Sequence, residues 1–157
     1  MRVMLLRAGV LAAILLAPAA GAELLATAGS YKRFLDEPAT FAYGAALRIR
    51  VIRRLAVRPE IIADYGRYYS TVLALGSVTF DFTDPGGKAV GYVVGSAGGL
   101  QTREDAIFTA TTWSALAGVG VRFPIAGNWT GAAEFRAGMP AFPLVTFNIG
   151  YRFGKAR

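Results

Sequence analysis

The chain contains no cysteine and no histidine among its 157 residues. Without cysteine there is no disulfide, no thiolate ligand for a metal and no cysteine to carry a lipid. Without histidine the chain lacks the commonest catalytic base and the commonest metal ligand in proteins. Ser77, Ser96 and Ser114 therefore have no histidine to activate them as nucleophiles. We predict that the protein is not an enzyme and has no catalytic residues, no metal site and no cofactor.

Long apolar runs are also scarce, and the one clear example lies at the start of the chain. Arg2 and Arg7 precede an apolar stretch at 8–17, and the small residues Ala20-Gly21-Ala22 follow it. This pattern is typical of a secretory signal peptide, and the apolar stretch is shorter than the ~20 residues that a helix needs to span a bilayer. We predict that residues 1–22 are a signal peptide cleaved before Glu23, and that 23–157 form one exported domain.

After residue 23, apolar side chains alternate with small or polar ones. In the segment 40–52, one alternate row is apolar and includes Phe41 and Leu47, whereas the other contains Ala42, Arg48 and Arg50. A period of two is the geometry of a β-strand. The sequence is 54% hydrophobic, yet no segment is a continuous apolar run long enough to span a membrane as a helix, and this leaves two classes of protein. One is a soluble β-protein with a large core, and the other is a transmembrane β-barrel.

Eight segments with this alternation can be counted, and turn signals such as Asp84-Pro85-Gly86-Gly87 separate them. The expected strands are 24–35, 40–52, 55–65, 71–83, 88–98, 108–123, 129–137 and 144–153. We expect an irregularity at Pro59, which has no N–H for the strand ladder, and the longest connection at 99–105. Eight antiparallel strands of about ten residues are the size of the smallest outer-membrane barrels. The predicted fold is all-β, an eight-stranded antiparallel up-and-down transmembrane β-barrel.

The last expected strand carries a further family feature. Its end, Asn148–Lys155, reads NIGYRFGK and alternates up to an aromatic residue. With the signal peptide and the repeated alternating strands, the chain resembles the small outer-membrane β-barrels of the OmpA-like transmembrane-barrel superfamily over about residues 23–154. The resemblance implies an integral protein of a Gram-negative outer membrane, surrounded by outer-membrane lipid. It also implies a monomer whose last strand is recognised by the outer-membrane barrel assembly machinery.

The two alternate rows predict two different surfaces, because one side of each barrel strand faces lipid and the other faces the lumen. The apolar row is expected to face lipid, namely Phe41, Tyr43, Leu47, Ile49, Phe80, Phe82, Trp113, Val121, Phe123, Trp129, Phe135, Val145, Phe147, Ile149, Tyr151 and Phe153. The charged row is expected in the lumen, namely Arg48, Arg50, Arg58, Glu60, Asp64, Asp81, Arg122, Glu134, Arg136 and Arg152. Charges in a narrow lumen must pair, so we expect arginine–carboxylate pairs that plug the barrel.

These features favour a structural role in envelope integrity, but they leave three alternatives open. Six expected lumen arginines against four carboxylates would suit a narrow anion-preferring channel. The outer loops could instead bind a partner or mediate adhesion. Alternation alone does not decide which row faces inward, so a soluble periplasmic lipocalin-like lipid binder is the third alternative. The formal charge of +7 comes without any nucleic-acid-binding motif, and we expect no nucleic-acid partner.

Overall fold

The computed structural model describes residues 22–32, 38–65, 69–104, 108–139 and 143–153. The expected signal peptide, apart from Ala22, lies outside the described residues, and cleavage before Glu23 stays a prediction. The first strand begins at Glu23, and the preceding Ala22 accepts a backbone hydrogen bond of 2.9 Å from the N–H of Phe153.

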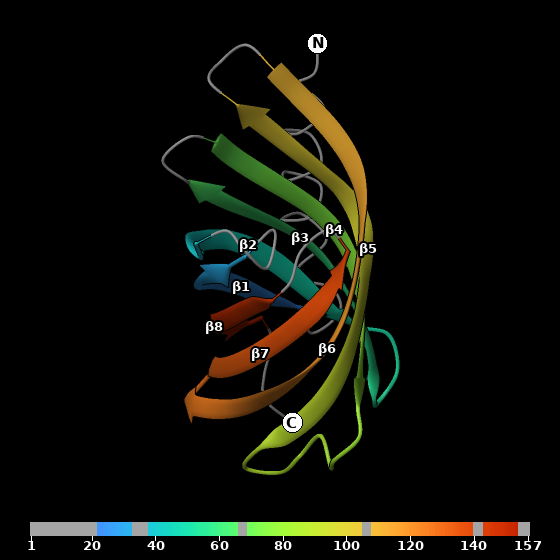
Figure 1. Ribbon diagram of the computed structural model, residues 1–157. Helices are drawn as coiled ribbons and strands as arrows, with labels where there is room; N and C mark the ends of the chain where they lie inside the picture. The colour runs from blue at the N-terminus through green and yellow to red at the C-terminus, as the bar shows by residue number, and fades with distance from the viewer. Residues whose placement is uncertain (1–21, 33–37, 66–68, 105–107, 140–142, 154–157) are drawn as a thin grey trace.

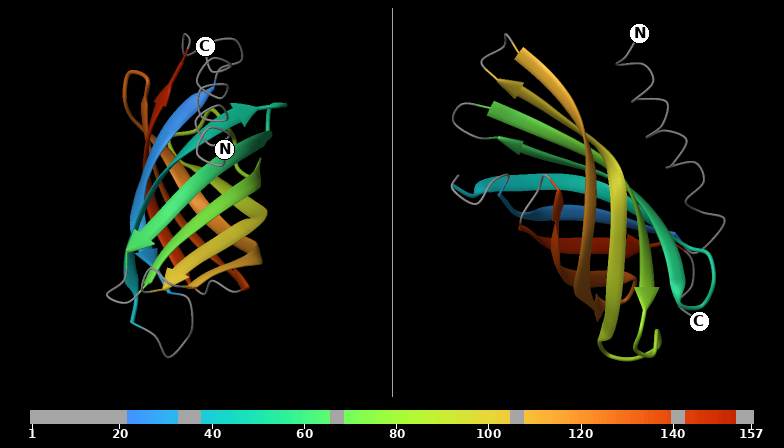
Figure 2. Two further views of the ribbon diagram at one scale, coloured as in Figure 1. Left: turned by 90° about the horizontal axis from the view of Figure 1, so that it is seen from above. Right: turned by 45° about the vertical axis from the view of Figure 1, so that its right-hand side comes forward.

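Eight strands form one closed barrel, and each is hydrogen-bonded to its neighbours in the chain (Figure 1). They are β1 (Glu23–Tyr31), β2 (Thr40–Arg50), β3 (Leu55–Tyr65), β4 (Tyr69–Asp81), β5 (Val90–Glu104), β6 (Phe108–Ala126), β7 (Trp129–Met139) and β8 (Leu144–Arg152). All pairings are antiparallel, and β1 pairs with β8 from Glu23↔Arg152 to Tyr31↔Leu144. Figure 2 shows the tilted strands wrapped around a single interior. The predicted eight-stranded up-and-down topology is confirmed.

The two ends of the barrel differ in their connections. The β2–β3, β4–β5 and β6–β7 turns lie at one end, together with Ala22 and Phe153, and we call it the turn end. The opposite end, which we call the loop end, contains the connections β1–β2, β3–β4, β5–β6 and β7–β8. At the loop end β5 and β6 project beyond the other strands (Figure 1). The described residues contain no helix long and apolar enough to cross a membrane.

Three expected boundaries were wrong by three residues or more, and several others by one or two. The stretch Gly99–Glu104, expected as loop, continues β5, because Leu100 and Thr102 are buried while Gln101 and Arg103 are exposed. The many polar residues of this stretch are typical of a loop, but their alternation with apolar residues is that of a strand. The expected turn at 124–128 begins later, since β6 runs to Ala126 with a register shift after Pro124. Proline lacks an N–H, and a shift of this kind accommodates it. The first strand ends at Tyr31 rather than residue 35, and 33–35 lie outside the described residues.

The expected irregularity at Pro59 is confirmed in the ladder between β2 and β3. Paired residues run to Ala46↔Glu60 and resume at Ile49↔Val57, leaving out the positions opposite Arg58 and Pro59. Because Pro59 cannot donate a hydrogen bond, the ladder is interrupted on this side. On the β4 side the pairing is continuous through Pro59↔Gly76.

Inward-pointing side chains fill the barrel in two chemically different halves. The half nearer the loop end is an apolar cluster made of Tyr31, Ala42, Ile62, Leu73, Leu75, Leu100, Leu116 and Leu144. The half nearer the turn end contains the charged residues described below. Charges in the lumen were predicted from the sequence, but this apolar layer was not, although Leu73 and Leu75 share their row with Asp81.

Most of the row expected to face lipid has exposed side chains on the outside of the barrel. The exposed members are Phe41, Tyr43, Phe80, Phe82, Trp113, Val121, Phe123, Trp129, Phe135, Phe147, Ile149 and Tyr151. Ile49, Val145 and Phe153 are half-buried. Leu47 differs: its strand register puts it opposite the exposed Leu24, yet it is only 5% exposed and clusters with Ala22, Ile49 and Phe153. Leu47 therefore lies in the outward row but is covered by neighbouring apolar side chains at the turn end, and its contact with lipid stays a prediction.

Candidate functional site

The centre of the lumen is built from two short charged motifs on opposite sides of the barrel. Arg58 and Glu60 lie two residues apart on β3, and Glu134 and Arg136 lie two residues apart on β7. Residues two apart on a strand point to the same face, so each strand presents one arginine and one carboxylate inward. The strands run in the same direction but carry the two charges in opposite order. Each arginine therefore meets a carboxylate across the lumen.

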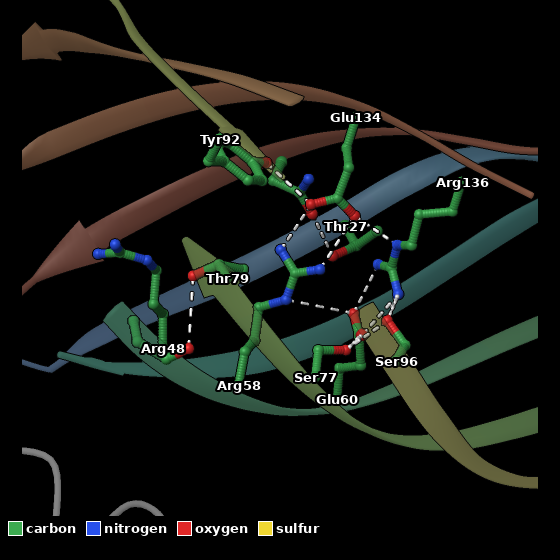
Figure 3. Close-up of polar contacts among 12 residues, drawn as sticks. Thr27, Arg48, Arg58, Glu60, Ser77, Thr79, Tyr92, Ser96, Glu134 and Arg136 are labelled. Carbon is green, nitrogen blue, oxygen red and sulfur yellow. Dashed lines mark hydrogen bonds and ion pairs between the residues drawn. The ribbon is translucent and has the colours of Figure 1, made fainter. Parts of the chain in front are cut away.

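These four side chains form a compact ion network, which we call the central layer (Figure 3). The guanidinium of Arg58 donates two hydrogen bonds to Glu134, at 2.8 and 2.9 Å. The guanidinium of Arg136 donates two to Glu60, at 2.6 and 2.8 Å, and its Nε donates to Glu134. Arg58 Nε also lies 3.6 Å from a Glu60 oxygen. All four residues are at most 5% exposed, so each arginine contacts both carboxylates away from solvent.

Neutral side chains satisfy further groups of the central layer. The hydroxyl of Tyr92 donates to Glu134 at 2.8 Å, and the hydroxyl of Ser77 donates to Glu60. Arg136 also donates to Ser96 at 3.1 Å, and the Oγ atoms of Ser77 and Ser96 are 2.8 Å apart. A buried ion pair is stable only when additional hydrogen bonds satisfy its remaining polar atoms. Strands β4 and β5 supply those bonds here.

A second group of charges lies closer to the turn end. Asp81 accepts a hydrogen bond of 2.9 Å from Arg122 and lies 3.5 Å from Arg48. Arg48 is in turn 3.6 Å from Glu23, which also accepts a hydrogen bond from Thr130. The guanidinium of Arg122 lies 5.6 Å from the centre of the Tyr92 ring. Tyr92 therefore contacts both this turn-end layer and the central layer.

The structure does not bring all ten expected lumen residues together. Arg50 is exposed and Arg152 is half-buried, because both lie at the end of their strands where the lumen opens. Asp64 is buried near the loop end and accepts a hydrogen bond of 2.8 Å from Thr40. Alternation along a strand predicts the direction of a side chain but not its depth in the barrel. This explains why Arg50 and Arg152, although in the inward row of their strands, lie at the mouth of the lumen rather than deep inside it.

Several lumen residues were missed in the sequence. Glu23 was not assigned because the first strand showed no clear register, and its burial raises the described buried charges to four arginines and five carboxylates. Tyr92 was not among the residues expected in the lumen. The lumen position of Tyr92 could have been identified from its pairing with Asp81, because residues paired across two strands share a face. The buried uncharged polar residues that were missed are Thr27, Thr71, Ser77, Thr79, Ser96, Thr102, Ser114, Thr130, Thr146 and Asn148.

The packing leaves little free space in the lumen. A cavity of about 10 Å³ remains between the turn-end layer and the central layer, lined by Glu23, Leu25, Arg48, Arg58, Thr79, Tyr92, Arg122, Thr130, Ala132 and Asn148. This is room for about one water molecule. Within the described part of the chain, no three carboxylate groups gather closely enough to hold a metal ion. The site is suited to charge pairing rather than to ligand binding.

Comparisons with known proteins identify the fold. No protein-family model matches the sequence, and no characterised protein sequence matches it. In structure the chain is similar to the N-terminal β-barrel domain of Pseudomonas aeruginosa OprF, with 13% identity over 85% of this chain and 97% of that one, and a TM-score of 0.69. It is also similar to neisserial surface protein A, NspA, with 14% identity over 84% and 96% of the two chains and a TM-score of 0.63. The chain thus has the fold of small eight-stranded outer-membrane barrels.

Proposed function

We propose that the protein is a non-enzymatic integral barrel of a Gram-negative outer membrane. The outer surface of the barrel supports this proposal, because the side chains of Trp113, Phe41 and Phe147 are 85%, 65% and 64% exposed there and would be poorly solvated by water. Both comparison structures are outer-membrane barrels. Membrane lipid surrounds the outer surface of the barrel. The last strand is the segment that the barrel assembly machinery would recognise.

We further propose that the lumen is permanently closed and that the role is structural. The observation that carries this is the central layer, in which two arginines and two carboxylates from opposite walls bridge the lumen. The apolar cluster fills the lumen on the loop side of this layer. A small solute would have to break several buried ion pairs and displace packed leucines to pass.

The alternatives have less support. A lipocalin-like lipid binder needs an apolar interior cavity, whereas the exposed aromatic row lies outside and charges lie inside. The channel hypothesis depended on an excess of lumen arginine, but the described buried groups are four arginines and five carboxylates. No described contact favours adhesion through the outer loops.

Planar-bilayer recording tests the closed lumen. The wild-type barrel should insert without discrete conductance steps, because the central layer and the apolar cluster obstruct it. Folding is verified separately by gel electrophoresis in detergent, in which the folded barrel migrates differently before and after heating. Reproducible steps with anion selectivity from verified, inserted protein would contradict the proposal and favour the channel.

A further inference from the structure

The turn end of the barrel carries an excess of exposed positive charge. The exposed or half-buried basic residues there, which we call the basic rim, are Arg50, Arg53, Arg54, Lys88 and Arg152. One described carboxylate at this end is exposed, Asp84, and it lies 3.6 Å from Arg53. The other two, Glu23 and Asp81, are buried inside the lumen. The described acidic side chains therefore leave most of the basic rim without a counter-charge.

The basic rim lies next to apolar side chains that project from the barrel. At the tip of the β2–β3 turn, Val51 and Ile52 are 56% and 61% exposed, directly before Arg53 and Arg54. Two exposed aliphatic residues beside two arginines suit a membrane interface better than bulk water. Arginine stems can lie along acyl chains there while their guanidinium groups reach the lipid headgroups.

An aromatic cluster marks the level of that interface. The Trp129 and Tyr151 rings meet edge to face at 5.2 Å, and the Tyr151 and Phe153 rings do so at 5.4 Å. Tryptophan and tyrosine concentrate where the hydrocarbon of a membrane meets its headgroups. Arg152 lies between Tyr151 and Phe153 in the chain, and its N–H donates to the carbonyl of Asn128, next to Trp129. The basic rim is therefore at headgroup height.

We infer that the basic rim binds the headgroups of anionic phospholipids, with guanidinium groups donating to lipid phosphates. This rests on the proposed membrane location and adds the lipid class that the barrel selects. Guanidinium matches the geometry of phosphate oxygens. The rim draws its charges from the end of β2, the β2–β3 turn, the β4–β5 turn and β8, so they come from several strands of the barrel. A lipid annulus surrounds the protein and can meet all of them, whereas one docked protein would contact a single side.

The two tryptophans of the chain allow a direct test, since they lie at opposite ends. The Trp113→Phe variant retains Trp129 beside the basic rim, and the Trp129→Phe variant retains Trp113 on β6 towards the loop end. Each is folded into vesicles with equal amounts of phosphatidylcholine and phosphatidylglycerol, in which one of the two lipids carries brominated acyl chains. Brominated phosphatidylglycerol should quench Trp129 more strongly than brominated phosphatidylcholine, with a local enrichment of up to about fivefold per engaged charge at low salt. Trp113 should show little difference.

A variant of the basic rim distinguishes the contribution of the arginines to lipid preference from that of the aromatic cluster. Combining Arg50→Gln, Arg53→Gln, Arg54→Gln and Arg152→Gln should abolish the preference at Trp129. The matched control, Lys32→Gln with Arg103→Gln at the loop end, should keep it. Equal quenching of Trp129 by both lipids, or a preference that survives in the rim variant, would overturn the inference. If neither tryptophan is quenched by either lipid, the chain is not in the bilayer and the proposed function itself fails.

Discussion

At the centre of the lumen, each of two arginines contacts both of two carboxylates, and no side chain of the four faces solvent. Removing charges from water is costly, and their mutual attraction offsets this only when the geometry is good and the other polar atoms are bonded. The hydroxyls of Tyr92 and Ser77 donate to Glu134 and Glu60, and the hydroxyl of Ser96 accepts a hydrogen bond from Arg136. Loss of one charged partner should therefore lower the free energy of unfolding more in the central layer than at the surface.

Glu134→Gln removes the charge that faces two arginines while nearly preserving the size of the side chain. We expect the free energy of unfolding to fall by about 3–5 kcal/mol, because the buried Arg58 and Arg136 are then left with one carboxylate, Glu60, between them. Urea unfolding of the barrel in vesicles, followed by the heat-sensitive shift in gel electrophoresis, measures this. The control is Asp84→Asn, the same chemical change at an exposed pair, with an expected loss below about 1 kcal/mol. Similar losses in the two variants would argue against a stabilising central layer.

At the scale of the strands, a narrow barrel limits which residues can point inward. Strand β5 contains Gly98, which pairs with the buried Leu75 and occupies a position on the inner face of the barrel. The next residue, Gly99, occupies a position on the outer face. A Cβ built on Gly98 would overlap the main-chain oxygen of Ala74, and one on Gly44 of β2 would overlap that of Ile61. A Cβ on Gly99 meets no atom within 4 Å. The close approach of neighbouring backbones therefore requires glycine at certain inner positions.

Gly98→Ala and Gly99→Ala give a matched pair in adjacent positions. Gly98→Ala should lower the free energy of unfolding by about 1–3 kcal/mol or prevent folding, because the backbone of β4 must shift. Gly99→Ala should change stability by less than about 0.5 kcal/mol. The folded fraction after dilution from urea into vesicles distinguishes them. Equal tolerance of both changes would contradict the register of β4 and β5.

At the scale of the whole molecule, the closed sheet leaves no unpaired edge along the shared length of the strands, and its hydrophobic surface is on the outside. This is the reverse of a soluble barrel. Phe147 lies near the middle of β8, paired with Ala28 and Ala133, whereas Tyr151 lies in the same row in the turn-end aromatic cluster. The two positions therefore sample different depths of the proposed membrane.

Phe147→Arg should destabilise the folded barrel in a bilayer by about 2–4 kcal/mol, and Tyr151→Arg by about 0–1 kcal/mol beyond the loss of its ring, because the cost of a charge falls towards the interface. Alanine variants at both positions measure the loss of the ring alone. Refolding into vesicles and urea titration give the free energies. Equal costs at the two depths, or purification of the wild type as a monomer without detergent, would contradict the membrane location.

Strand number, antiparallel order and the direction of most side chains could be predicted because alternation is a local property of the chain. Tyr43 and Phe80 point outward, and Arg58 and Glu134 inward, as the period of two predicts. The polar stretch after Gly98 was misjudged because its composition resembles a loop, although its alternation continues. In that stretch the composition predicted a loop and the periodicity predicted a strand, and the structure has a strand.

Residue depth and cross-barrel partners could not be deduced in this way, because they depend on the stagger of eight strands around a closed cylinder. That stagger leaves Arg50 at the mouth of the lumen and covers Leu47. It also brings Glu23 within 3.6 Å of Arg48 and places the apolar cluster on the loop side of the ions. The order of residues along the chain thus determined a membrane-type barrel with a charged inner row. Closure of the sheet decided which of those charges meet, because only closure sets the distance between strands far apart in the sequence.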